Sequence, residues 1–118
     1  MLKELNKESF KKRVHNYELD KEEWNFQGDK PCIIDFYADW CGPCQALLPT
    51  LGMLSEEYKE KFNIVKVNVD DNKELAAAFK VRSIPALFFI KDKTVVESLT
   101  GNQPMSVLEK KIQQHLQA

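Results

Sequence analysis

The chain has 118 residues, the usual length of one compact domain with its own hydrophobic core. Hydrophobic residues make up 43% and charged residues 30% of it, a balance typical of globular rather than disordered or fibrous proteins. The formal net charge of -1 gives no basic surface for nucleic acid or for acidic membranes. We therefore expect one domain over residues 1–118 whose partners are proteins, with no nucleic-acid partner and no membrane partner.

The cysteine content favours redox or metal chemistry over a scaffold of structural disulfides. There are three cysteines, an odd number, and Cys41 and Cys44 have the spacing C-x-x-C. The N-terminus lacks the continuous apolar stretch of a signal peptide, and no later segment has the length of a membrane span. We expect a cytoplasmic protein, or a periplasmic one if a leader peptide was removed.

The first thirty residues predict a short strand, a helix and a polar connection. Residues 2–5 are expected to form the strand, and Asn6 is placed to cap the helix. The apolar stripe of this helix has helical spacing and consists of Phe10, Val14 and Tyr17. Residues 18–30 are polar and charged and end in a turn signal, so we expect them to form a connection.

The next segment predicts a central strand followed by a helix. Residues 32–38 are almost all apolar, as in a strand that is buried on both faces. Apolar residues then follow helical spacing, which places Cys41 at the helix N-terminus and Cys44 one turn inside. Pro49 is expected to kink this helix, because it lacks a backbone donor and its ring crowds the preceding turn.

The second half of the chain predicts a strand, a short helix, a hairpin and a last helix. Residues 62–69 are strand-like, and residues 70–72 are expected to cap the short helix. Residues 86–90 and 94–100 are close enough to form an antiparallel hairpin. Pro104 opens the last helix, whose inward residues are Val107, Leu108, Ile112 and Leu116. The whole pattern indicates an α/β fold, with a mixed sheet and helices on both faces.

Cys41 and Cys44 have the arrangement that disulfide exchange requires, with an attacking thiolate and a second thiol nearby. A helix N-terminus lowers the pKa of a cysteine, so Cys41 is the expected nucleophile and Cys44 the resolving thiol. The alternative is a zinc or iron-sulfur ligand pair, which normally needs four ligands. The remaining candidates are Cys32, His15 and His115, scattered along the chain. We favour redox chemistry and expect no metal and no cofactor.

Asp35 is an acidic residue inside the apolar run of the predicted central strand. Burial raises the pKa of a carboxyl, and a poised acid six residues before Cys41 is suited to take the proton from Cys44. The alternatives are a structural pair between Asp35 and Lys66, which lies on the next predicted strand, or an Asp35 side chain that points outward at a sheet edge. Ile84-Pro85 precedes another strand, and the sequence leaves open whether that peptide bond is cis or trans.

Residues 35–44 read Asp-Phe-Tyr-Ala-Asp-Trp-Cys-Gly-Pro-Cys. Further landmarks follow downstream, namely Pro49, Lys66, Ile84, Pro85 and Gly101. This pattern resembles the thioredoxin family from about residue 31 onward, and W-C-G-P-C with an Asp six residues before the first Cys is highly specific. The resemblance implies a thioredoxin fold, with Cys41 as nucleophile, Cys44 as resolving cysteine, Asp35 as buried acid and Lys66 beside it.

The resemblance also implies a substrate surface and a direction of electron flow. Substrate polypeptide is expected to bind along the backbone beside a cis-proline, which would be Pro85. The implied contact residues are Trp40, Gly42, Pro43, Ile84, Pro85 and Gly101. The Gly-Pro dipeptide between the cysteines resembles the one in reducing members, so we expect a protein-disulfide reductase. Its electrons are expected to come from an NADPH-linked thioredoxin reductase. We also expect the protein to be a monomer.

The sequence departs from the common family pattern at a few positions. Tyr37 stands where Trp is frequent, Ser83 where Gly is frequent and Ala86 where Thr is usual, while Asn102 makes the contact rim more polar. Two other functions stay open, an oxidase or isomerase with the same fold and a binding module whose redox chemistry is incidental. Cys32 is an additional thiol that we expect to be a small core residue.

Overall fold

The computed structural model describes residues 2–4, 31–92 and 94–116. The predicted helix that begins after Asn6 and the predicted connection over residues 18–30 lie outside the described residues. The predicted first strand is present, and of its described residues 2–4 the last two, Lys3 and Glu4, are in strand conformation.

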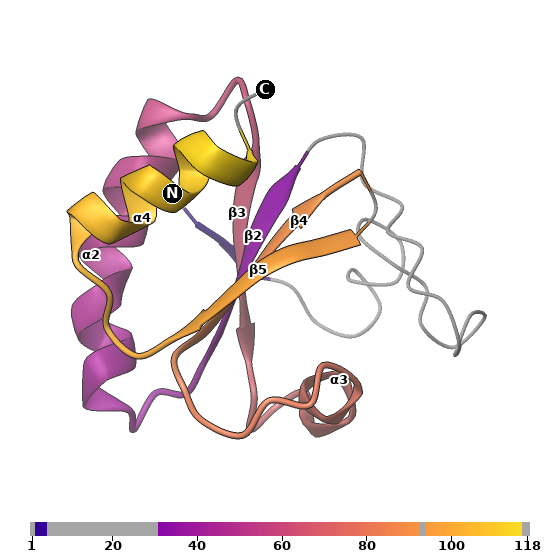
Figure 1. Ribbon diagram of the computed structural model, residues 1–118. Helices are drawn as coiled ribbons and strands as arrows, with labels where there is room; N and C mark the ends of the chain where they lie inside the picture. The colour runs from indigo at the N-terminus through magenta and orange to yellow at the C-terminus, as the bar shows by residue number, and fades with distance from the viewer. Residues whose placement is uncertain (1, 5–30, 93, 117–118) are drawn as a thin grey trace.

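A mixed sheet of five strands forms the centre of the molecule (Figure 1). Its order is β1-β3-β2-β4-β5, in which β1, β3 and β2 are parallel and β4 and β5 are antiparallel to their neighbours. The strands are β1 (Lys3–Glu4), β2 (Cys32–Tyr37), β3 (Asn63–Asn68), β4 (Ala86–Lys91) and β5 (Thr94–Thr100). The predicted parallel pair and the predicted hairpin are both confirmed.

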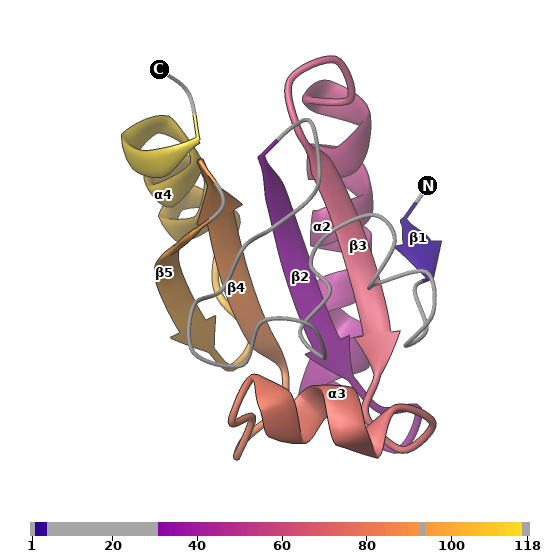
Figure 2. The same cartoon turned by 90° about the vertical axis from the view of Figure 1, so that its right-hand side faces the viewer.

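Three described helices cover the two faces of this sheet, as the sequence predicts. They are α2 (Gly42–Glu57), α3 (Lys73–Ala78) and α4 (Met105–His115). Helices α2 and α4 lie against one face and α3 lies against the other (Figure 2). One buried cluster lies between the sheet and α2 with α4, and a second lies between the sheet and α3. None of the helices in the described ranges has the length and apolar character needed to cross a bilayer.

Strand β2 is the middle strand, and all six of its residues are buried. Successive side chains point to opposite faces, so Ile33 packs with the α2 and α4 cluster while Ile34 packs with the α3 cluster. By the same alternation Asp35 points to the face that α2 covers. The predicted strand buried on both faces is therefore confirmed, and its acidic residue lies beneath the helix that begins at the C-x-x-C motif.

Helix α2 begins directly after Cys41, which is its N-cap residue with an extended backbone. Pro43 lies in the first turn, where the missing N–H costs no intrahelical hydrogen bond. The buried side of the helix consists of Cys44, Leu47, Leu51 and Leu54. The helix continues through Pro49 to its end, and the kink expected at Pro49 stays a prediction.

Two local predictions need correction. Asn72 occupies the N-cap position of α3, as predicted, but makes no side-chain capping bond, and its side-chain amide donates to the Asn68 carbonyl 2.9 Å away. Val107 on α4 is only partly buried, whereas Leu108, Ile112 and Leu116 are in the core as predicted. Pro104 is the N-cap residue of α4, next to the predicted start.

The strand directions bring four loops to one edge of the sheet. The parallel strands β2 and β3 both end at this edge, and the antiparallel β4 begins there because Ala86 pairs with Phe36. Strand β5 ends at the same edge, where Thr100 pairs with Ala86. The C-x-x-C motif follows β2 directly, so segments far apart in the sequence surround it.

Candidate active site

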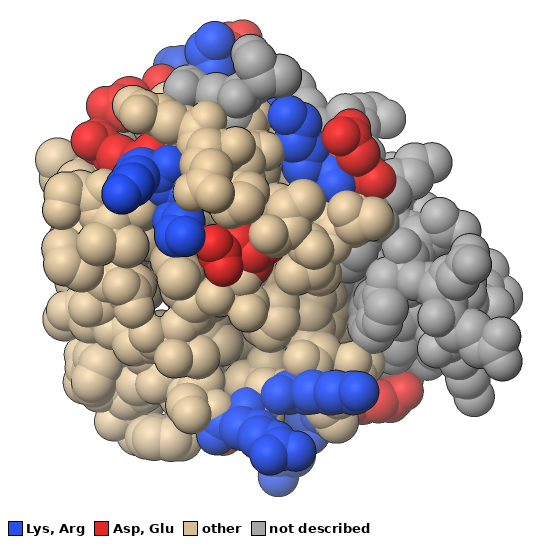
Figure 3. All heavy atoms as spheres, viewed as in Figure 1, with Lys and Arg blue, Asp and Glu red and all other residues tan. Residues whose placement is uncertain are grey.

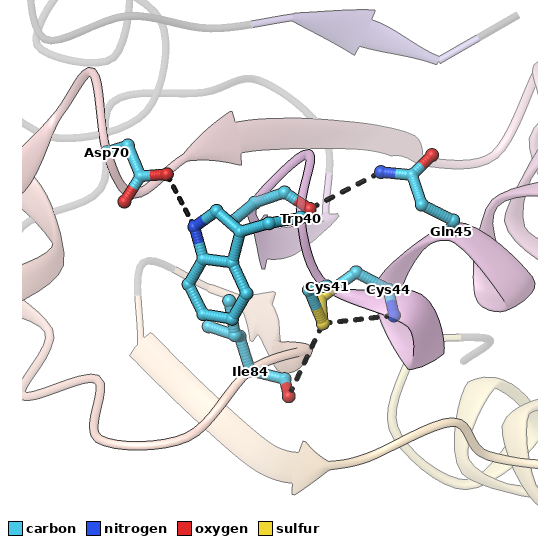
Figure 4. The surroundings of a disulfide bond; sticks show 7 residues. Trp40, Cys41, Cys44, Gln45, Asp70 and Ile84 are labelled. Carbon is cyan, nitrogen blue, oxygen red and sulfur yellow. Dashed lines mark hydrogen bonds between the residues drawn. A yellow bond between two sulfur atoms is a disulfide. The ribbon is translucent and has the colours of Figure 1, made fainter.

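Cys41 and Cys44 form a disulfide at the start of α2, with their Cα atoms 5.2 Å apart (Figure 4). Both cysteines are buried, and Cys41, at 5% exposure, keeps slightly more exposed surface than the fully buried Cys44. The backbone N–H of Cys44 donates to Cys41 Sγ at 3.2 Å. Together with the positive end of the helix, this donor favours a thiolate at Cys41 once the disulfide is reduced.

The loop before β4 contacts the disulfide from the side. The Ile84 carbonyl oxygen lies 3.9 Å from Cys41 Sγ, and the Ile84-Pro85 peptide bond is cis. The Gly101 N–H donates to the Pro85 carbonyl at 2.9 Å, which ties the end of β5 to this loop. Gly101 has a φ of 87°, a left-handed conformation that glycine adopts without strain. The structure thus brings these three predicted contact residues to the edge where Cys41 lies.

Trp40, Gly42 and Pro43 lie on the other sides of the disulfide, and all three are exposed. Trp40 is 71% exposed although its indole N–H donates to a carboxylate oxygen of Asp70, 2.8 Å away (Figure 4). Gln45 donates to the Ala38 carbonyl at 3.3 Å and so joins α2 to the loop that carries Trp40. The large apolar ring is therefore held at the surface rather than folded into the core.

Asp35 is fully buried on β2. Neither of its carboxylate oxygens has a hydrogen-bond partner among the described residues. The pKa of Asp35 is raised from 3.8 to about 7, mainly because burial disfavours the charged carboxylate. The positive charge of Lys66 opposes this rise, and the negative charge of Glu4 adds to it. A pKa raised toward neutrality suits a group that has to accept and release a proton near neutral pH.

Lys66 lies beside Asp35 on the neighbouring strand β3, where the two are register partners. The ion pair that the described residues give Lys66 is with Glu4, at 3.7 Å, and the lysine side chain is 26% exposed. The simple structural pair between Asp35 and Lys66 is therefore not what the structure contains. No pattern in the sequence points to Glu4 or Asp70, because each contacts a distant part of the chain.

Cys32 lies at the far end of β2 from the disulfide and is 7% exposed. It packs in the core on the α3 side of the sheet, and burial raises the pKa of its thiol to about 12. This confirms the expectation of a small core residue. His115 lies 3.3 Å from Glu97, and His15 is outside the described residues. Within the described ranges, no three His, Cys, Asp or Glu side chains gather as metal ligands.

Comparison with known proteins agrees with the geometry of this site. The family model described as thioredoxin matches residues 1–114. This chain belongs to the thioredoxin family. Its sequence is 43% identical to a thioredoxin of Haemophilus influenzae over 103 residues, which cover 87% of this chain and 96% of that protein. It is 44% identical to a thioredoxin of Borreliella burgdorferi over 86 residues, 73% of each chain.

A thioredoxin of Bacillus subtilis is 43% identical over 84 residues, which cover 71% of this chain and 81% of that protein. Membership of the thioredoxin family, together with the C-x-x-C disulfide, makes the chain a thiol-disulfide oxidoreductase. It is a redox carrier that reduces protein disulfides, and its substrates are disulfide-containing proteins. This agrees with the reductase expected from the Gly-Pro dipeptide.

Proposed function

We propose that Cys41 is the nucleophile of this reductase and Cys44 its resolving thiol. The Cys41 thiolate attacks one sulfur of the substrate disulfide, which forms a mixed disulfide and releases the other substrate sulfur as a thiolate. Cys44 then attacks Cys41 Sγ, which releases the second substrate sulfur and leaves the Cys41–Cys44 disulfide. The observation that carries this order is the position of Cys41 as the N-cap residue of α2, where the Cys44 N–H donates to its sulfur, while Cys44 lies inside the first turn.

Asp35 is proposed as the general base for the second step. Cys44 must lose its proton before it attacks, and water has little access to a fully buried thiol. Asp35 lies on the sheet face beneath α2, and its raised pKa of about 7 matches the pH at which the step occurs. Lys66 is proposed to stabilise the ionised form of this acid from the neighbouring strand.

The six contact residues are proposed to bind the substrate polypeptide around the disulfide. They are Trp40, Gly42, Pro43, Ile84, Pro85 and Gly101. Exposure of Trp40, Gly42 and Pro43 supports this role, as does the contact between Ile84 and Cys41. In the space-filling view, the surface over the start of α2 has no charged side chains, whereas Lys and Arg gather toward α3 (Figure 3). Binding through backbone hydrogen bonds, with few side-chain charges to match, suits many different polypeptides.

The electron donor is proposed to be an NADPH-linked thioredoxin reductase, and the protein is proposed to act in the cytoplasm as a monomer of one domain over residues 1–118. A pair that must return to the dithiol state after each turnover needs a reducing partner and a reducing compartment. The Cys-Gly-Pro-Cys motif supports this direction of electron flow through its resemblance to reducing members of the family.

The order of the two cysteines is tested by trapping. We expect Cys41→Ser to abolish insulin-disulfide reduction, because the one remaining cysteine of the described site, Cys44, is fully buried inside the first turn of α2. Cys44→Ser is expected to accumulate a mixed disulfide with insulin that mass spectrometry detects, because nothing resolves it. Cys32→Ser is the matched control and should retain full activity, since this thiol is buried in the core. Activity in the Cys41→Ser protein would contradict the proposed mechanism.

A further inference from the structure

Three charged side chains form a row across the parallel part of the sheet. Glu4 on β1 is the register partner of Lys66 on β3, and Lys66 is the register partner of Asp35 on β2. Register partners in parallel strands point to the same face of a sheet. Tyr37 lies two residues after Asp35 on the same strand and therefore shares that face. The row has a base between two acids, with a phenol at one side.

The members of this row contact one another unequally. The Tyr37 hydroxyl donates to Glu4 Oε1 at 2.5 Å, and Lys66 Nζ lies 3.7 Å from the same oxygen. The ammonium group also lies over the Tyr37 ring, 5.1 Å from its centroid. Glu4, Tyr37 and Lys66 thus form a closed set of three contacts. Asp35, by contrast, has no hydrogen-bond partner for either oxygen within the described part of the chain.

This inequality matters because Asp35 and Glu4 compete for one cation. An ammonium in direct contact with Asp35 would favour the ionised carboxylate and make it a weaker base. Lys66 lowers the pKa of Asp35 and Glu4 raises it, so the two neighbours act against each other. Glu4 therefore acts on Asp35 in two ways. Its negative charge raises the pKa of Asp35 directly, and its ion pair with Lys66 holds the ammonium group that would lower this pKa.

We propose that Glu4, held by the Tyr37 hydroxyl, is a positioning residue that keeps the Lys66 ammonium off Asp35 and so tunes Asp35 as the proton acceptor for Cys44. The proposal rests on the role proposed above for Asp35. In the resolving step the Asp35 carboxylate takes the proton from Cys44 Sγ, and the new thiolate attacks Cys41 Sγ. The bond between Cys41 and the substrate sulfur breaks, the substrate leaves as a thiolate, and Asp35 later releases its proton to solvent.

The groups that face Asp35 come from every described element packed against it. Glu4 faces it from β1, Lys66 from β3 and Tyr37 from its own strand β2. Helix α2 contributes the buried Cys44, and β4 contributes the uncharged register partner Leu87. Among these described groups, Glu4 and Lys66 carry the formal charges at neutral pH, so one substitution at either position tests the balance.

The direct test is a carbon-13 NMR titration of the Asp35 carboxyl in the oxidised protein, with Glu4→Gln. We expect the Asp35 midpoint to fall by about half a pH unit or more, because a negative neighbour is lost and Lys66 is free to turn toward Asp35. The matched control is Glu97→Gln. Glu97 lies on β5 and is also ion-paired, since its Oε1 lies 2.8 Å from Nζ of Lys111 on α4. An unchanged or raised midpoint in Glu4→Gln would overturn the proposal.

Two further variants keep the test decisive if Glu4→Gln fails to fold. Tyr37→Phe removes only the hydroxyl that holds Glu4, and we expect a smaller fall of the same sign. Lys66→Met removes the competing cation, and we expect the Asp35 midpoint to rise. If both midpoints stay at the parent value, the positioning role is wrong.

The pH profile of insulin-disulfide reduction separates this proposal from the role of Asp35 itself. Asp35→Asn should remove the acidic limb of the profile, and Glu4→Gln should move that limb to lower pH in parallel with the NMR midpoint. A profile unchanged by Asp35→Asn would contradict the general-base role. A profile that Asp35→Asn changes, combined with an NMR midpoint that Glu4→Gln leaves in place, would contradict only the positioning role.

Discussion

Asp35 occupies a site where an ionised carboxylate is unfavourable, since it is fully buried and both of its oxygens are without partners among the described residues. Its pKa rises from 3.8 to about 7, so the folded protein keeps a proton that the unfolded chain releases between these two pH values. The free energy of unfolding must therefore fall as the pH rises through this window and level off above it. The same burial that costs stability supports the role proposed for Asp35, because it raises the pKa of the carboxyl toward neutral pH.

We predict that Asp35→Asn stabilises the protein at alkaline pH. Asparagine has nearly the same shape and stays neutral, so the variant and the parent should match near pH 4 and diverge up to pH 7. Above pH 7 the variant should be more stable by up to about 4 kcal/mol, from the free energy of one pKa unit. Guanidinium unfolding of the oxidised proteins at several pH values measures this difference.

The control for this prediction is Asp71→Asn, which changes an exposed carboxylate in the turn before α3. Its unfolding free energy should follow the parent closely at all pH values. Curves for Asp35→Asn and the parent that stay parallel from pH 4 to pH 8 would contradict the buried-acid account.

Helix α2 positions Cys41 as its N-cap residue and is anchored in the core by its buried face. Its buried residues follow helical spacing, and this is why the helix and its inward face were predictable from the sequence. Strand β2 was predictable for a similar reason, because its residues are almost all apolar, as a strand buried on both faces requires. The strand ends were less predictable: β3 lacks the first and last residues of the predicted segment 62–69, and the last of them lies in the turn that follows the strand.

We predict that Leu51→Ala lowers the free energy of unfolding by about 2–5 kcal/mol, because Leu51 is fully buried on α2 and its loss leaves a cavity. Met53 lies on the same helix but is 65% exposed, so Met53→Ala is the matched control and should cost well under about 1 kcal/mol. Chemical denaturation of both variants provides the measurement. Equal losses in the two proteins would mean that α2 is not anchored by its buried face.

At the scale of the whole molecule, the sheet order brings four loops to one edge, and the site is the place where they meet. The sequence predicted the strands and helices from hydrophobic spacing, and the resemblance to a family supplied the residues around Cys41. Neither predicted that Asp70 holds Trp40 or that Glu4 contacts Lys66 and Tyr37. Hydrophobic patterns identify buried faces, but a polar contact between distant residues depends on strand register, which they leave undetermined.

This thioredoxin-family protein is a reductase, and the Cys41–Cys44 pair passes its electrons to substrate disulfides. The most direct measurement is the reduction potential of this pair, from equilibration against dithiothreitol or glutathione, with NADPH oxidation by a thioredoxin reductase followed in parallel. We predict a value near about -270 mV together with steady turnover by the reductase. A value near about -120 mV, typical of a strong thiol oxidant, without turnover would contradict the account.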